Sequence, residues 1–322
     1  MQIDSPEETR DRFIGSILGG AIGDALGMPF EGWPPDEIRQ HWGDKVFLSS
    51  LPVRGLAPGQ YTDDTHMTIC HLKSLLDSGR LDPEDTARKF TKWFDSGDLR
   101  GIGASTEYSM RMLKQGRSWQ ESGATGEYAA GNGGAMRIAP VGLFYYGDIP
   151  SLKEAVRQAV IITHNNTEAV AGAAAVAYIV GRAAGGDLGL DKAINDTREF
   201  IGDSAVSENL AKTEILLKDE ARPEEALKVL GTSGYVVETV ASAFFCFLST
   251  PGDFRSTVVN AVQGGHDTDT TAAVAGAISG AFNGVGGIPQ DWINGLEDND
   301  RLASMAGRLY DVCHKTGGGN GQ

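Results

Sequence analysis

Apolar residues return every three or four positions along most of the chain, whereas the sustained alternation typical of strands is hard to find. A period of three to four residues is typical of α-helices that bury one face. The pattern therefore predicts an all-α protein. The predicted helices begin near residues 9, 64, 83, 103, 135, 151, 166, 190, 204, 222, 234, 253, 268 and 299.

Capping residues support several of these helix starts. Ser5 and Asp82 each stand directly before a proline. Proline favours the first helical turn, and the side chains of serine and aspartate accept unpaired backbone N–H groups there. Ser151 and Glu154 have the spacing of a capping box. These residues predict helix N-termini at three points along the chain.

The connections between the predicted helices contain no linker or shift in composition that would divide the chain. Turn-forming residues predict connections at 29–37 and 51–61, and the stretch 116–134 is long enough to form a binding loop. Residues 1–316 are therefore predicted to form one domain. The glycine-rich tail, 317–322, is predicted to be disordered.

Glycines recur at every fourth position of the first predicted helix and leave one of its faces without side chains, so that another helix can approach closely. These glycines are Gly15, Gly19, Gly23 and Gly27. Within the same helix, Asp24 is predicted to be structural and bonded to a neighbouring helix start. Glu31 follows in a loop rich in proline and glycine, where its carboxylate can either reach a cavity or lie at the surface.

Charge and cysteine content exclude several classes of protein. A net charge of −15 over 322 residues argues against binding a nucleic-acid backbone. Three cysteines without a C-x-x-C pair indicate reduced thiols in a cytoplasmic protein. The acidic first residues lack the apolar core of a signal peptide, and the longest apolar run, 169–180, is too short to cross a bilayer. We expect a soluble protein that does not bind membranes.

Two acidic clusters, about 200 residues apart, each stand directly before an apolar helix: "TDDT" at 62–65 and "DTDTT" at 267–271. Either cluster alone is typical of an N-cap. One cap residue suffices for a helix, however, and each start carries two carboxylates with flanking hydroxyls. Such hard oxygens favour Mg²⁺, Mn²⁺ or Ca²⁺ over Zn²⁺. The adjacent His66 and His266 fit neighbours of such a site better than ligands.

A glycine-rich turn, "GNGG" at 131–134, precedes a predicted apolar helix and could point backbone N–H groups at an anion such as a phosphate. It is neither a P-loop nor a dinucleotide-binding fingerprint. His164 stands just before another predicted helix. Its residue type is compatible with a ligand contact and equally with a helix-start histidine that binds nothing.

Six segments occur in one order: "GGAIGDALGMPFEG", "YTDDTHMT", "GNGGAMRIAPVGL", "ITHNNTEAVAGAAAVAY", "SGYVVETVASAFF" and "GGHDTDTTAAVAGAISGA". Together they resemble the ADP-ribosylglycohydrolase family from about residue 11 to residue 290. The resemblance implies a compact single-domain orthogonal helical bundle that holds two divalent cations, Mg²⁺ or Mn²⁺, in an ADP-ribose cleft. The implied cation-binding residues are Thr62, Asp63, Asp64, Asp267, Asp269 and Thr270.

The resemblance also implies roles for other residues. Glu31 matches a mobile acidic residue, and the implied catalytic residues are Glu31, Asp63, Asp64 and Asp269. The implied substrate-binding residues are Gly131, Asn132, Gly133, His164 and Tyr235. Two positions depart from the family pattern. His266 stands where many relatives have glycine, and Ala130 stands where some have an aromatic residue that helps to hold the adenine.

The implied reaction is hydrolysis of the glycosidic bond between ADP-ribose and a modified side chain, with arginine favoured over serine, and with release of ADP-ribose. The partner would then be an ADP-ribosylated protein or a small ADP-ribose conjugate, and we expect a monomer. One alternative is a hydrolase of another conjugate, such as O-acetyl-ADP-ribose. A second alternative is a non-catalytic, crystallin-like or ADP-ribose-binding protein on the same scaffold.

Overall fold

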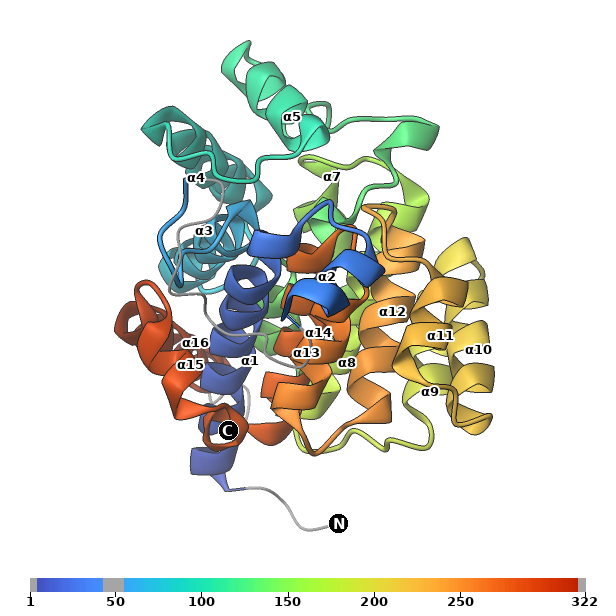
Figure 1. Cartoon of the computed structure of the whole chain (residues 1–322). Coiled ribbons are helices and arrows are strands. Elements are labelled where there is room, and N and C mark those ends of the chain that lie inside the picture. Colours follow the sequence, from blue (N-terminus) through green and yellow to red (C-terminus); the bar gives the residue numbers. More distant parts are fainter. Residues whose placement is uncertain (1–4, 43–54, 318–322) are drawn as a thin grey trace.

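The computed structural model describes residues 5–42 and 55–317, which form sixteen α-helices and four 3₁₀ turns (Figure 1). The described residues contain two isolated β-bridges but no strand, so the all-α prediction is confirmed. The α-helices are α1 (Pro6–Gly27), α2 (Pro35–Trp42), α3 (Asp63–Ser78), α4 (Pro83–Ser96), α5 (Ala104–Lys114), α6 (Ala139–Phe144), α7 (Ile149–Ile161), α8 (Thr167–Ala184), α9 (Ala193–Ile201), α10 (Ala205–Lys218), α11 (Pro223–Leu230), α12 (Val236–Ser249), α13 (Phe254–Gln263), α14 (Thr268–Asn283), α15 (Gln290–Gly295) and α16 (Asn299–Gly317). The 3₁₀ turns are η1 (Met28–Phe30), η2 (Glu127–Ala129), η3 (Asn132–Gly134) and η4 (Val285–Gly287).

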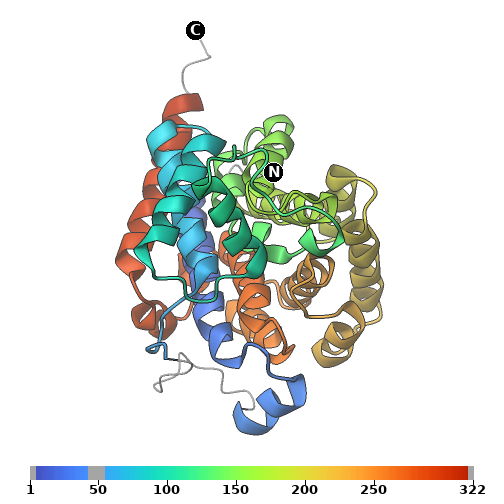
Figure 2. The ribbon, with the colours of Figure 1, turned by 90° about the horizontal axis from the view of Figure 1, so that it is seen from above.

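Helices α1 and α14 lie side by side in the middle of the bundle (Figures 1 and 2). Helices α3, α4 and α16 lie on one side of this pair, and α10, α11 and α12 lie on the other (Figure 1). Helix α8 packs against α6, α7 and α14. The N-terminal ends of α3 and α14 therefore both lie close to α1, although they are distant along the chain.

The predicted glycine face of α1 forms its contact with α14. A methyl group at Gly19 would overlap the carbonyl oxygen of Gly276, and one at Gly23 would overlap that of Ala272. Only glycine admits so close an approach, so the packing prediction is confirmed. Near the end of α1, a methyl group at Gly27 would overlap the carbonyl oxygen of Thr268. The end of α1 is thereby fixed beside the acidic start of α14.

The segment Pro6–Phe30 is long and apolar enough to cross a membrane by those two measures alone. In the structure, however, 83% of its most apolar window is buried inside the protein. Its apolar side chains, such as Phe13, Ile22 and Leu26, belong to the main core. This burial identifies α1 as the central core helix of the fold.

Most of the predicted helix starts are confirmed to within a few residues. Ser5 and Glu8 form a capping box, and Asp82 accepts the backbone N–H of Asp85. The capping box predicted for Ser151 is wrong, because α7 begins earlier and its cap is Asp148, which accepts the Ser151 N–H.

Three further expectations differ from the structure. Helix α2 occupies part of the connection predicted at 29–37, because its proline lies at the first helical position, where proline is tolerated. Helix α15 was not predicted. The helix expected near residue 135 begins only at Ala139, after the 3₁₀ turn η3. Residues 51–54 of the second predicted connection, and the predicted tail beyond Gly317, lie outside the described residues.

Candidate active site

Asp24 of α1 caps the start of α3. Its Oδ1 accepts the Thr62 backbone N–H at 3.0 Å and the Thr62 hydroxyl at 2.9 Å. Its Oδ2 accepts the Thr65 N–H at 3.1 Å and the Thr65 hydroxyl at 2.6 Å. All three side chains are buried. The structural role predicted for Asp24 is confirmed, and the carboxylates of Asp63 and Asp64 are not needed as caps.

Asp63 lies under the loop that connects α4 to α5. Its backbone N–H donates to the carbonyl oxygen of Arg100 at 2.8 Å, and the Gly103 N–H bonds to its carboxylate. A methyl group at Gly101 would lie 2.8 Å from Asp63 Oδ1. Burial, followed by the nearby carboxylate of Asp24, raises the pKa of Asp63 to about 7. The loop 99–103 therefore closes one side of the first acidic cluster.

Asp267 is the N-cap residue of α14, but its side chain makes no capping hydrogen bond. Instead, Asp267 Oδ2 accepts from Asn132 Nδ2 at 2.7 Å, and the Asp267 N–H donates to the Thr232 carbonyl at 3.0 Å. Asp269 Oδ1 accepts the N–H of Thr270 at 2.9 Å. The second cluster is therefore tied to the glycine-rich loop that contains Asn132.

The two acidic clusters meet in the structure. Burial raises the pKa of Asp64 well above its usual range, the carboxylates of Asp24, Asp63 and Asp267 raise it further, and a hydrogen bond with the Thr270 side chain opposes this rise. Burial also raises the pKa of Asp269, and the main charges that add to this effect are Asp267, Asp64 and Glu31. Asp64 of the first cluster thus lies within electrostatic reach of Asp267 and Asp269 of the second, and Glu31 lies within reach of Asp269.

The donor set fits hard divalent cations by its chemistry. All the oxygens come from carboxylates and hydroxyls, and Asp64 Oδ2 is buried without a hydrogen-bond partner among the described residues. Those residues do not, however, contain a group of three acidic, histidine or cysteine side chains arranged as a ready ligand shell. Asp267 and Asp269 point to hydrogen-bond donors of the protein, Asn132 and the Thr270 N–H. At least one oxygen of each of these carboxylates is thus already engaged by a donor of the protein.

The predicted substrate-binding residues form a second group beside the carboxylates. Asn132 donates its N–H to the carbonyl oxygen of Gly234 at 3.1 Å, and an isolated bridge pairs Gly131 with Tyr235. The buried ring of His164 packs on the loop, so that a methyl group at Gly133 would lie 2.6 Å from its Cε1. The structure therefore brings Gly131, Asn132, Gly133, His164 and Tyr235 together.

The histidines beside the acidic clusters point elsewhere. His66 Nε2 lies 2.9 Å from Arg100 Nη2, and its ring stacks on that of Trp93. His266 has a φ of 60°, in the left-handed region that favours glycine. Its backbone pairs with the loop after η1, since its carbonyl accepts the Gly32 N–H at 2.6 Å.

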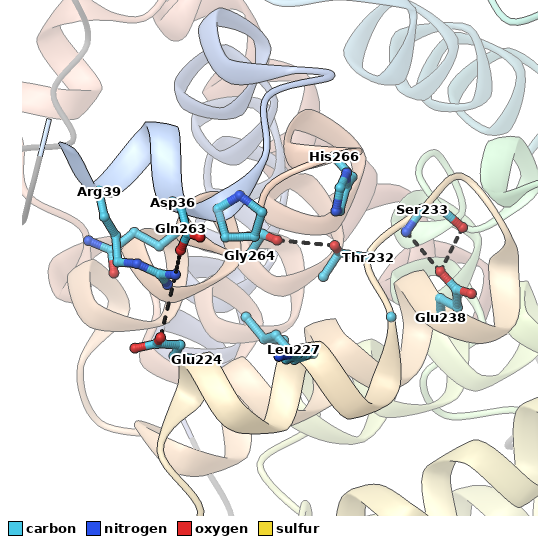
Figure 3. A pocket seen from close by; sticks show the side chains of 13 residues that line it. Asp36, Arg39, Glu224, Leu227, Thr232, Ser233, Glu238, Gln263, Gly264 and His266 are labelled. Atoms are coloured by element: carbon cyan, nitrogen blue, oxygen red, sulfur yellow. Dashed lines mark hydrogen bonds and ion pairs between the residues drawn. The ribbon is translucent and has the colours of Figure 1, made fainter. Parts of the chain in front are cut away.

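A cavity of about 660 Å³ lies beyond His266, between α2, α11 and the segments 231–233 and 263–266 (Figure 3). Arg39 lies on its wall 2.6 Å from Asp36 and 3.5 Å from Glu224. On the opposite side, Glu238 accepts from the N–H and the hydroxyl of Ser233 (Figure 3). The wall of the cavity thus carries charged side chains of both signs, and the cavity adjoins the backbone that carries Asp267.

The fold and the site define an all-α protein with a buried carboxylate cluster beside a glycine-rich loop. The family model described as ADP-ribosylglycohydrolase matches residues 5–319, so the chain belongs to that family. Among its relatives, ADP-ribosylhydrolase ARH3 of Danio rerio is 30% identical, covering 99% of this chain and 96% of the relative. ADP-ribosylarginine hydrolase Tri1 of Pseudomonas putida is also 30% identical, covering 95% and 80%.

A solved structure titled "ADP-ribosylglycohydrolase-related protein complex" is similar to this chain with a TM-score of 0.78 and 29% identity, covering 95% of this chain and 99% of that one. The prediction of the family from its six ordered segments is confirmed.

Sequence reasoning missed Arg137, which is fully buried between the carboxylates and the glycine loop. A lone arginine within the apolar segment 135–145 was the available signal.

Proposed function

We propose that this protein is a metal-dependent hydrolase that cleaves the glycosidic bond between ADP-ribose and a modified side chain and releases ADP-ribose. Membership of the ADP-ribosylglycohydrolase family supports hydrolysis of ADP-ribose linkages. The observation that carries the proposal is the meeting of Asp64 with Asp267, Asp269 and Thr270 beside the glycine loop. The arginine hydrolase among the relatives favours arginine as the modified residue, with serine as the second candidate.

Two divalent cations, Mg²⁺ or Mn²⁺, would be held by the oxygens of both helix starts. When bound, such cations orient ribose hydroxyls and lower the pKa of a bound water. The residues that would hold them are Thr62, Asp63, Asp64, Asp267, Asp269 and Thr270. Asp24 would keep the first three in place, because it fixes the backbone of the α3 start.

The remaining residues have separate roles in this proposal. Glycoside cleavage passes through an oxocarbenium-like state, which nearby carboxylates such as Asp64 and Asp269 stabilise. Glu31 lies within electrostatic reach of Asp269 and would transfer a proton as general acid or base. The N–H groups of the glycine loop, with His164, would hold the diphosphate, and the half-exposed ring of Tyr235 would border the sugar or base.

The test is release of ADP-ribose from peptides modified on arginine or on serine, and from O-acetyl-ADP-ribose, with Mg²⁺, Mn²⁺ or EDTA. Asp269→Ala should abolish release from the preferred substrate, while Asp291→Ala, which removes an exposed aspartate on α15, should leave the rate unchanged. Full activity of Asp269→Ala would overturn the assignment. If the wild-type protein binds ADP-ribose but releases none, it is a binding protein on the same scaffold.

Glu31→Gln separates catalysis from binding in the same assay. The amide cannot transfer the proton, so turnover should fall about a hundredfold. Affinity for ADP-ribose, measured by calorimetry, should change less than turnover. An unchanged turnover number would remove Glu31 from the reaction.

A further inference from the structure

A buried cation lies between the acidic cluster and the glycine loop. Arg137 is 0% exposed, and in the described part of the chain its guanidinium donates to neutral acceptors. Nη2 lies 2.6 Å from the Thr163 hydroxyl and 3.4 Å from the Ala159 carbonyl, and Nη1 lies 3.5 Å from the sulfur of Met67. Nε has no partner there. The nearby carboxylates of Asp63 and Asp64, and the Phe90 ring at 4.8 Å, offset part of the cost of burying this charge. They do not account for the hydrogen bond to Thr163.

The shortest hydrogen bond of this guanidinium is to Thr163, whose hydroxyl in turn contacts His164. Thr163 Oγ1 lies 2.6 Å from Arg137 Nη2 and 2.8 Å from His164 Nδ1, and all three residues are buried. Arginine has only donors, so Thr163 must accept from it. The hydroxyl then keeps one hydrogen to give, and within the described residues His164 Nδ1 is the acceptor in reach. Thr163 therefore accepts from Arg137 Nη2 and donates its hydroxyl hydrogen to His164 Nδ1, which gives all three groups a partner.

This donation decides where His164 carries its own proton. Burial, followed by the charge of Arg137, lowers the pKa of His164 to about 3, so the ring is neutral at ordinary pH. A neutral imidazole that accepts at Nδ1 has its single proton on Nε2. Arg137 itself keeps its charge, since burial lowers its pKa only to about 9. Hence the Nε2 of His164 is an N–H donor.

The Nε2 atom faces the glycine loop. A methyl group at Gly131 would lie 3.2 Å from Nε2, and one at Gly133 would lie 3.1 Å from it. No hydrogen bond of Nε2 is recorded among the described residues, although the side chain is 4% exposed. An N–H donor that lies beside a glycine turn, on a side chain that is almost wholly buried, is suited to an anionic ligand there.

We propose that Arg137, acting through Thr163, is a positioning residue that fixes the Nε2–H tautomer of His164 and so presents a donor to the diphosphate of the ligand. The contact between His164 and the diphosphate rests on the proposed function. The tautomer of His164 is a property of the ligand-free protein and does not depend on that function. In this role Arg137 acts as an obligate hydrogen-bond donor to Thr163, in addition to its favourable charge interaction with Asp63 and Asp64.

The tautomer can be measured in ligand-free, ¹⁵N-labelled protein from long-range ¹H–¹⁵N correlations of the histidine rings, with the His164 signals assigned by their loss in His164→Ala. The wild-type ring should carry its proton on Nε2. Thr163→Val has nearly the same shape but no hydroxyl, so a large fraction of Nδ1–H should appear. Thr163→Ser keeps the hydroxyl and should retain the wild-type tautomer.

We call the chain of hydrogen bonds from Arg137 through Thr163 to His164 the relay. A wild-type His164 ring protonated on Nδ1, or an unchanged tautomer in Thr163→Val, would overturn it. Arg137→Met should give mixed tautomers, because the Thr163 oxygen is then free to accept from Nδ1–H. A folded Arg137→Met protein with the wild-type tautomer would remove Arg137 from the relay. If Arg137→Met does not fold, the Thr163 pair still decides whether the relay exists.

Calorimetry with ADP-ribose and Mn²⁺ tests the ligand part. Thr163→Val should weaken binding on the order of tenfold, as expected for a lost hydrogen bond to a charged group, and Thr163→Ser should bind like the wild type. A changed tautomer with unchanged affinity would refute the diphosphate contact. If the wild type binds no ADP-ribose although its tautomer is as expected, the proposed function fails and the relay stands.

Discussion

A histidine buried without partners should make the stability of this protein depend on pH in a way that one substitution removes. His71 lies on α3 with 0% exposure, and neither ring nitrogen has a hydrogen-bond partner among the described residues. Its ring meets the edge of Phe90 at 5.2 Å. Burial, followed by the charge of Arg137, lowers the pKa of His71 well below its usual range. His71→Leu replaces the ring with an apolar side chain that does not titrate.

The sign and size of the effect follow from proton linkage. The unfolded chain takes up a proton on His71 as the pH falls through about 6.5, whereas the folded protein does not, so the wild type loses stability toward acid pH. At pH 5.5 this loss is about 1.4 kcal/mol, and at pH 7.5 it is close to zero. His71→Leu also removes two unpaired polar atoms, which should raise the free energy of unfolding by about 1 kcal/mol at every pH.

Guanidinium unfolding of wild type and variant in EDTA, between pH 7.5 and 5.5, measures this difference. The acidic cluster titrates in both proteins, so its contribution cancels in the comparison. His71→Gln is the matched control, because glutamine does not titrate but keeps polar atoms buried. Relative to the wild type, His71→Gln should gain unfolding free energy at pH 5.5 but not at pH 7.5, because it lacks the gain that His71→Leu shows at every pH. A difference between His71→Leu and wild type that is equal at both pH values would refute the reasoning.

Three further predictions concern the support of the site. Asp24→Asn leaves at least one N–H or hydroxyl of the α3 start facing an amide donor, so unfolding free energy should fall by about 2–4 kcal/mol and Mn²⁺ affinity should fall with it; unchanged Mn²⁺ binding would contradict this role. Gly23→Ala pushes a methyl group into the backbone of α14 and should lower stability by about 3 kcal/mol in denaturant titrations, whereas Gly252→Ala, in open space, should be nearly neutral. Mn²⁺ at about 100 times its dissociation constant should stabilise the protein by about 2.7 kcal/mol in thermal unfolding, and a shift of equal size in Asp269→Ala would show that the cation binds elsewhere.

The sequence predicted the fold well where the periodic signal was long. Helices such as α8 and α14 contain sixteen or more residues of clear pattern, and both were predicted to begin within a residue of their observed starts. Helices α2 and α15 have eight and six residues and stand among prolines and glycines that are typical of turns, so their short apolar pattern does not stand out. The cap of α7 was misplaced because Asp148 and Ser151 both suit a cap, and only packing decides between them.

The site was predictable in its residue types but not in its geometry. Excess carboxylates at two helix starts indicated a shared site, and the structure brings Asp64 and Asp269 together. The side-chain directions of Asp267 and Asn132 depend on neighbours that no local pattern specifies. Burial of Arg137 is likewise a property of the whole fold, since an arginine in an apolar segment is as easily placed at the surface as in the core.

Helix α1 explains how two clusters so distant along the chain meet. Its glycine face fixes the start of α14, because Gly27 lies against Thr268, while Asp24 on the same helix fixes the start of α3. The first contact joins backbone to backbone and the second joins a carboxylate to backbone N–H groups, so both leave little freedom in the separation of the two starts. Protein packing, rather than attraction to cations, therefore sets the burial and, after it, the crowding of carboxylates that raise the pKa values of Asp64 and Asp269. A site built in this way has its carboxylates assembled before any ligand arrives, so the proposed binding of divalent cations would need only rotation of side chains and loss of protons.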